Sequence, residues 1–80
     1  MELTHGHPPI AAAGPLIAAM EEVDSQAVLG SLLIVLGATG APEATPIIDQ
    51  YRGSKNEDLR ESAHSARSRW IRRRLRPAAD

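Results

Sequence analysis

Apolar residues recur at intervals of three and four positions along the first half of the chain. The first stripe consists of Leu16, Ile17, Met20 and Val23. This spacing is typical of one face of a helix, and Pro15 suits the first helical position. A second apolar stretch follows Asp24 and Ser25, both good N-caps, and stops at a glycine-rich segment. The pattern predicts helices over 15–23 and 25–37.

The run 32–36 consists of five consecutive apolar residues and is also compatible with a buried strand. The segments on both sides of this run have helical spacing. We therefore predict that the run belongs to the second helix.

The second half of the chain has the same spacing. A third helix is predicted over 42–52, because Pro42 and an acidic residue suit its first turn. A fourth is predicted over 57–75, with Asn56 as its N-cap. The apolar stripes of these two helices are Ala44, Ile47, Ile48 and Tyr51, then Leu59, Ala63, Ala66 and Trp70.

A shift of 31 positions superimposes the two halves. The aligned pairs are Pro15 with Pro46, Leu16 with Ile47, Ile17 with Ile48, Met20 with Tyr51, Val28 with Leu59, Leu32 with Ala63 and Val35 with Ala66. The halves agree in the placement of apolar residues more than in identity. A period of this length with two helices per unit is typical of an α-solenoid.

The segment 36–48 runs Leu-Gly-Ala-Thr-Gly-Ala-Pro-Glu-Ala-Thr-Pro-Ile-Ile and resembles the junction between HEAT-like repeats of the phycobilin-lyase type. Segment 57–63 resembles the start of that family's second helix, with its aliphatic residue followed by arginine. The resemblance covers residues 14–71 and implies an all-α fold, a short HEAT-like α-solenoid of two helix-turn-helix repeats with four helices. It also implies that Arg60 meets an acidic residue of the neighbouring repeat, for which Asp24 is the candidate. The chain departs from the family pattern at Leu29 and at Arg67-Ser68.

Eighty residues allow a single domain. His7-Pro8-Pro9 opposes helix formation, so we predict a flexible N-terminal arm over 1–13. The two-repeat domain is then expected over 14–76, followed by a short tail over 77–80.

Few residues predict catalysis. Cysteine is absent, which excludes disulfides and thiolate metal sites, and His5 and His7 lack a third ligand nearby in sequence. Glu61 and His64 have the spacing of an acid–base pair on a helix, but no nucleophile accompanies them. We expect a protein that is not an enzyme and has no metal and no cofactor.

The apolar runs are shorter than the roughly 18 residues that a membrane span requires. The start of the chain also lacks the basic segment and apolar run of a signal peptide. We therefore expect no membrane association and a cytoplasmic location, which the lack of cysteine fits.

Charge is distributed unevenly. Residues 1–61 contain nine acidic and three basic residues, a net charge of −6, whereas residues 62–80 contain six arginines and one aspartate, a net charge of +5. Arginines at 3–1–3 spacing form one helical stripe, which makes them candidates for binding an anion. These candidates are Arg69, Arg72, Arg73 and Arg76.

The second helix contains more apolar residues than its own hairpin requires. We expect Val28, Leu32 and Val35 to pack the hairpin, which leaves Leu29, Leu33 and Ile34 as candidates for a protein interface. The alternative is that the N-terminal arm, with Ile10, covers these three side chains. Trp70 lies on the inward stripe of the fourth helix and is a further candidate, either as core or as an interface anchor.

These features predict a protein–protein interaction module, either an adaptor or a self-associating domain. Repeat arrays generally need about three units, because each repeat buries its apolar face on its neighbours. We therefore expect a homo-oligomer or a protein partner. The alternative is an arginine-rich module that binds nucleic acid or another anion.

Overall fold

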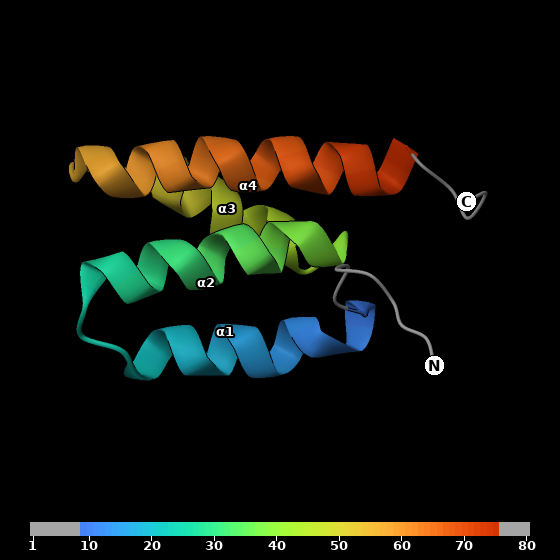
Figure 1. Ribbon diagram of the computed structural model, residues 1–80, viewed down its shortest axis with the longest axis horizontal. Helices are drawn as coiled ribbons and strands as arrows, with labels where there is room; N and C mark the ends of the chain where they lie inside the picture. The colour runs from blue at the N-terminus through green and yellow to red at the C-terminus, as the bar shows by residue number, and fades with distance from the viewer. Residues whose placement is uncertain (1–8, 76–80) are drawn as a thin grey trace.

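The computed structural model describes residues 9–75, which form one short 3-10 helix and four α-helices (Figure 1). The elements are η1 (Ile10–Ala12), α1 (Ala13–Glu22), α2 (Gln26–Thr39), α3 (Ala44–Arg52) and α4 (Glu57–Leu75). No strand occurs in this part of the chain, so the predicted all-helical class is confirmed and the run 32–36 is helical.

The helix starts follow the period that the sequence predicts. Ala13 and Ala44 begin α1 and α3, 31 positions apart, and Gln26 and Glu57 begin α2 and α4 at the same separation. Figure 1 shows α2 between α1 and α4, with α3 behind α2 and α4. The colours show that α2 and α4 run in the same direction and that α1 runs against α2. The two hairpins therefore lie side by side through their second helices.

Two of the predicted N-caps are confirmed. The Ser25 hydroxyl accepts a hydrogen bond from the Val28 N–H at 3.3 Å, and the Asn56 side-chain carbonyl accepts one from the Leu59 N–H at 3.1 Å. These side chains satisfy backbone donors that have no partner inside the first helical turn. They fix where α2 and α4 begin.

The predicted N-terminal arm over 1–13 extends too far. Residues 10–12 form η1, and Ala13 begins α1 and is fully buried in the core. The folded domain therefore includes residues 10–13. The candidates His5, His7 and Arg76 and the tail 77–80 lie outside the described residues.

The end of α2 lies beyond the predicted position. The helix passes through Gly37 and ends at Thr39, and Gly40 follows with a left-handed φ of 68°. The Gly40 N–H then donates to the Gly37 carbonyl at 3.1 Å. Glycine adopts this conformation without the steric cost that a Cβ atom brings. Gly40 is therefore the helix terminator, and Gly37 has a different function.

Gly37 and Gly30 allow α2 and α4 to approach closely. A Cβ atom on Gly37 would lie 2.2 Å from the backbone oxygen of Ala66, and one on Gly30 would lie 2.7 Å from the Ser62 Oγ. The core around this contact is built from small and aliphatic side chains. Its fully or almost fully buried members are Ala13, Leu33, Leu36, Ala41, Ala44, Ile48, Ala63 and Ala66.

The prediction of which α2 residues pack the hairpin is wrong for Val28 and Val35, whereas Leu32 is half-buried and packs against the core. Leu33 is 0% exposed and belongs to the core, whereas Val28 is 45% and Val35 41% exposed. The close contact with α4 explains the difference, because Leu33 lies three and four positions from the two glycines and shares their face. Leu29 is half-buried and packs against the core, and Ile34 is half-buried.

Candidate functional site

An uncharged, mostly apolar strip lies on the solvent-exposed side of α2. It consists of Ala27, Val28, Ser31 and Val35, all exposed, and we call these four residues the open edge of α2. Successive helical residues are rotated by about 100°. Val28 and Val35 each precede a glycine of the α4 contact by two positions, so their side chains point away from α4.

The internal repeat allows the open edge of α2 to be compared with the equivalent positions of α4. The positions in α4 that correspond to Val28 and Val35 are Leu59 and Ala66. Leu59 is 5% exposed and Ala66 is fully buried, and Ala66 lies directly against Gly37 of α2. The same register positions are therefore buried in a helix–helix contact in α4 and open to solvent in α2.

The face of α4 that is equivalent to the α4-contacting face of α2 is polar. In α2 the face that receives α4 contains Gly30, Leu33 and Gly37. The residues at the equivalent positions of α4 are Glu61, His64 and Ser68, which are all exposed. The two helices therefore present different outer surfaces, since α2 contains no charged residue from Gln26 to Thr39, whereas α4 exposes charged and polar side chains.

Trp70 holds the connection between α2 and α3. Its indole N–H donates to the Ala41 carbonyl at 2.8 Å, and the Arg74 guanidinium lies 5.2 Å from the ring centroid. Arg74 also donates to the Gly40 carbonyl at 3.1 Å. The Trp70 side chain is half-buried and packs against the core. Trp70 therefore stabilises the fold by attaching α4 to the α2–α3 connection.

Replacing Trp70 by phenylalanine is therefore expected to destabilise the fold moderately. The variant keeps an aromatic ring but loses the indole hydrogen bond to the Ala41 carbonyl, which then accepts only from the Ala44 N–H, and a hydrogen bond of this type contributes about 0.5–1.5 kcal/mol. Urea unfolding followed by circular dichroism measures the change. An unfolding midpoint equal to that of the parent would show that the hydrogen bond does not contribute.

The candidate arginines differ in their surroundings. Arg73 is half-buried against Gly40, and its Nε has no hydrogen-bond partner among residues 9–75. Arg69 and Arg72 are exposed, and neither forms an ion pair with another residue of the range 9–75. Of the four candidates, Arg69 and Arg72 are thus the two that the described residues show as exposed side chains.

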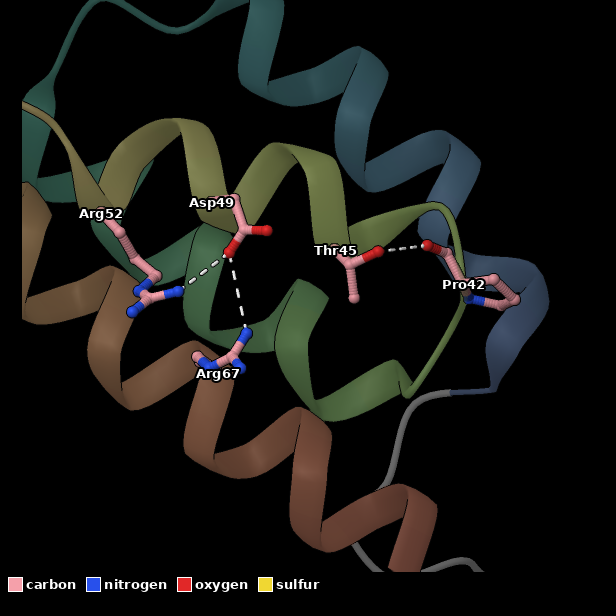
Figure 2. Close-up of polar contacts among 5 residues, drawn as sticks. All are labelled: Pro42, Thr45, Asp49, Arg52 and Arg67. Carbon is pink, nitrogen blue, oxygen red and sulfur yellow. Dashed lines mark hydrogen bonds and ion pairs between the residues drawn. The ribbon is translucent and has the colours of Figure 1, made fainter.

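Other arginines contact nearby backbone or acidic groups. Figure 2 shows the Asp49 carboxylate of α3 between two guanidinium groups. Its Oδ1 lies 3.1 Å from a nitrogen of Arg52 and 3.7 Å from a nitrogen of Arg67 on α4. The same figure shows the Thr45 hydroxyl, which donates to the Pro42 carbonyl before α3. These ion pairs are exposed and contribute little to stability. Arg60 donates to the carbonyls of Ser54 and Lys55 rather than to Asp24, so that expectation from the resemblance is wrong.

Two further observations bear on the chemistry. Between residues 9 and 75 no three His, Cys, Asp or Glu side chains lie close enough together to hold a metal ion. None of the helices in this range is both long enough and apolar enough to span a bilayer. His64 is exposed on α4, as is Glu61.

No protein-family model matches the chain, and neither curated proteins nor solved structures give a match. The HEAT-like resemblance therefore stays a prediction that rests on the residues of segments 36–48 and 57–63.

Proposed function

We propose that this chain is a non-catalytic, cytoplasmic protein–protein interaction module that binds another protein through the open edge of α2. One observation carries the proposal: Val28 and Val35 are exposed, while their equivalents Leu59 and Ala66 are buried in the contact between α2 and α4. Burying a valine side chain fully contributes about 1.5–3 kcal/mol. A partner that covers this edge gains part of that free energy for each valine.

The proposal includes a HEAT-like arrangement of the two hairpins. The identical spacing of the helix starts and the parallel course of α2 and α4 support it. In such an arrangement each second helix packs between its neighbours in the array. The open edge of α2 is then a position where the next helix is missing from the described residues, and an interacting protein would supply one.

A pull-down with matched variants tests the proposed function. The double variant Val28→Glu with Val35→Glu is expected to lose the proteins that the parent retains, because it places two charges on the apolar edge. Both side chains are exposed, so the helical content should be unchanged. The control is Ser65→Glu with Ser68→Glu, which adds the same charge to exposed positions of α4. Retention of the same proteins by the parent and the Val28/Val35 variant would contradict the proposal.

A second candidate function is binding of a polyanion through Arg69 and Arg72. The observation in its favour is that both side chains are exposed, one turn apart on α4, without an acidic partner among the described residues. If it is correct, Arg69→Glu with Arg72→Glu should weaken binding to double-stranded DNA or heparin by at least about tenfold at low salt, and the parent's affinity should fall steeply with salt. No measurable binding by the parent would exclude this function.

A further inference from the structure

We infer that the C-terminal half of α4 binds double-stranded nucleic acid by lying in a groove of the duplex, between the two phosphate backbones. The segment concerned is 67–75, which we call the projecting end of α4. The inference rests on the second candidate function, since it names the polyanion and adds arginines on a second side of the helix.

The projecting end extends past the end of α2. Figure 1 shows that the two parallel helices begin at the same end of the molecule, and α4 contains 19 residues where α2 contains 14. Ile71 is accordingly 37% and Leu75 74% exposed, and Arg72 and Arg74 are exposed between them. An α-helix with its side chains is about 10–12 Å wide, which fits the major groove of B-DNA at about 12 Å.

The projecting end is also strongly basic. It contains five arginines in nine residues, and no acidic residue occurs from Ser62 to Leu75. Asp49 of α3 lies 3.7 Å from one of these arginines, Arg67. Within the range 9–75, no acidic side chain forms an ion pair with the other exposed ones, which are Arg69, Arg72 and Arg74. Such a surface attracts the phosphates of a nucleic acid.

The arginines lie on both sides of the exposed apolar pair, and this arrangement favours a groove. Successive helical residues are rotated by about 100°, so Ile71 and Leu75 lie about 40° apart on one face of α4. Arg74 lies about 60° beyond Ile71, and Arg72 lies about 60° beyond Leu75 in the opposite direction. A flat anionic surface contacts a helix on one side, whereas a groove has a phosphate backbone on each side.

The apolar pair is too small for a lipid surface. Helices that lie in a bilayer interface bury a broad apolar face. The projecting end offers two exposed aliphatic side chains, and the neighbouring position on this face is the exposed Ser68. In the major groove, aliphatic side chains can contact the methyl group of thymine. The pattern therefore fits a duplex better than a membrane.

Fluorescence anisotropy with a short DNA duplex, measured with the full chain at several salt concentrations, tests the inference. We expect log affinity to fall with log salt with a slope of about −3 to −4, as for three or four neutralised phosphates. Arg72→Gln and Arg74→Gln change opposite sides of the helix, and each should reduce the slope by about one. The control Lys55→Gln removes the same charge at an exposed position before α4 and should leave the slope unchanged.

Arg74→Gln also removes a hydrogen bond to the Gly40 carbonyl, so its helical content is checked by circular dichroism. Arg67→Gln tests the same side of α4 without that bond. It should likewise reduce the slope by about one.

A matched pair of double variants tests the apolar face. Ile71→Glu with Leu75→Glu places two negative charges between the arginines and should weaken duplex binding by at least about tenfold. Val28→Glu with Val35→Glu makes the same change on the open edge of α2 and should leave duplex binding unchanged. All four side chains are exposed, so both variants should retain the helical content of the parent.

Several outcomes would overturn the inference. A loss of affinity in Arg72→Gln, with none in Arg74→Gln and Arg67→Gln, would show contact on one side of the helix only. Equal losses in the two double variants would show that the projecting end is not the binding surface. Binding to heparin or to phosphatidylserine vesicles without binding to the duplex would also overturn it.

The failure of this inference is distinguishable from failure of the functions on which it depends. A parent that binds heparin through Arg69 and Arg72 but does not bind the duplex retains the second candidate function. A parent that binds neither polyanion contradicts both. The pull-down with the Val28/Val35 variant tests the protein-binding function independently of either result.

Discussion

Replacement of Gly37 by alanine is expected to unfold the protein or bring it close to unfolding. The added Cβ would lie 2.2 Å from the oxygen, 2.7 Å from the carbonyl carbon and 2.8 Å from the Cα of Ala66. All three are backbone atoms, so no side chain can rotate away and α2 must separate from α4. Overpacking of this kind costs about 1–3 kcal/mol and occasionally more. We expect a loss near or above the upper end, against a total stability of about 5 kcal/mol for a small domain.

Urea unfolding followed by circular dichroism measures this effect, and two other glycines supply controls. A Cβ atom at Gly14 would meet no atom of a packed neighbour within 4 Å, so Gly14→Ala should cost far less than Gly37→Ala, with only the local cost of a Cβ before Pro15. At Gly30 the nearest atom is the Ser62 hydroxyl, which can rotate, so Gly30→Ala should have an intermediate cost. A Gly37→Ala variant as stable as the parent would contradict the close contact between α2 and α4.

Replacement of Leu33 by alanine is expected to have the second-largest effect. Leu33 is fully buried, and truncating a buried leucine costs about 2–5 kcal/mol because it removes apolar contacts and leaves a cavity. Val28 lies on the open edge of the same helix, so Val28→Ala should cost less than about 1 kcal/mol. The two variants therefore compare the two faces of α2 directly.

The same unfolding measurement compares these variants. The expected result is a large decrease in the urea midpoint for Leu33→Ala and a small change for Val28→Ala. If Val28→Ala were the more damaging variant, the assignment of faces made from the sequence would be correct and the open edge would not exist.

The number of helices and their approximate positions can be predicted from the sequence because local residues determine them, although α1 begins before the predicted Pro15, at Ala13, and α3 begins after the predicted Pro42, at Ala44. Ser25 and Asn56 cap backbone donors within their own helices, and these contacts need no tertiary information. The predicted range of the fourth helix, 57–75, agrees with α4. The 31-residue shift also predicts the spacing of the helix starts.

The rotation of α2 cannot be predicted in the same way, because the helix is apolar around most of its circumference. Leucine, isoleucine and valine gain similar free energy on burial, so their pattern does not determine which face is buried. The relevant signal is the pair Gly30 and Gly37, which share a face with Leu33. The sequence alone favours Gly37 as the helix end instead, because glycine is common at both kinds of position.

The environment of the arginines cannot be predicted either. Arg74 and Trp70 donate to the backbone carbonyls of Gly40 and Ala41, which lie 34 and 29 positions earlier in the chain. A backbone carbonyl is present at every residue, so sequence does not show which one will accept a hydrogen bond. Spacing alone therefore predicts a uniform exposed stripe of arginines, whereas Arg73 is half-buried.

The reactivity of single cysteines on α2 tests most directly whether this helix has one buried and one open apolar face. Val28→Cys and Leu33→Cys are labelled with a maleimide at low protein concentration, and each rate is compared with the rate of the same variant in urea. The account predicts that the cysteine at position 28 reacts almost as fast in the folded as in the unfolded protein, whereas that at position 33 is strongly protected. Equal protection at both positions, or protection of position 28 alone, would contradict it.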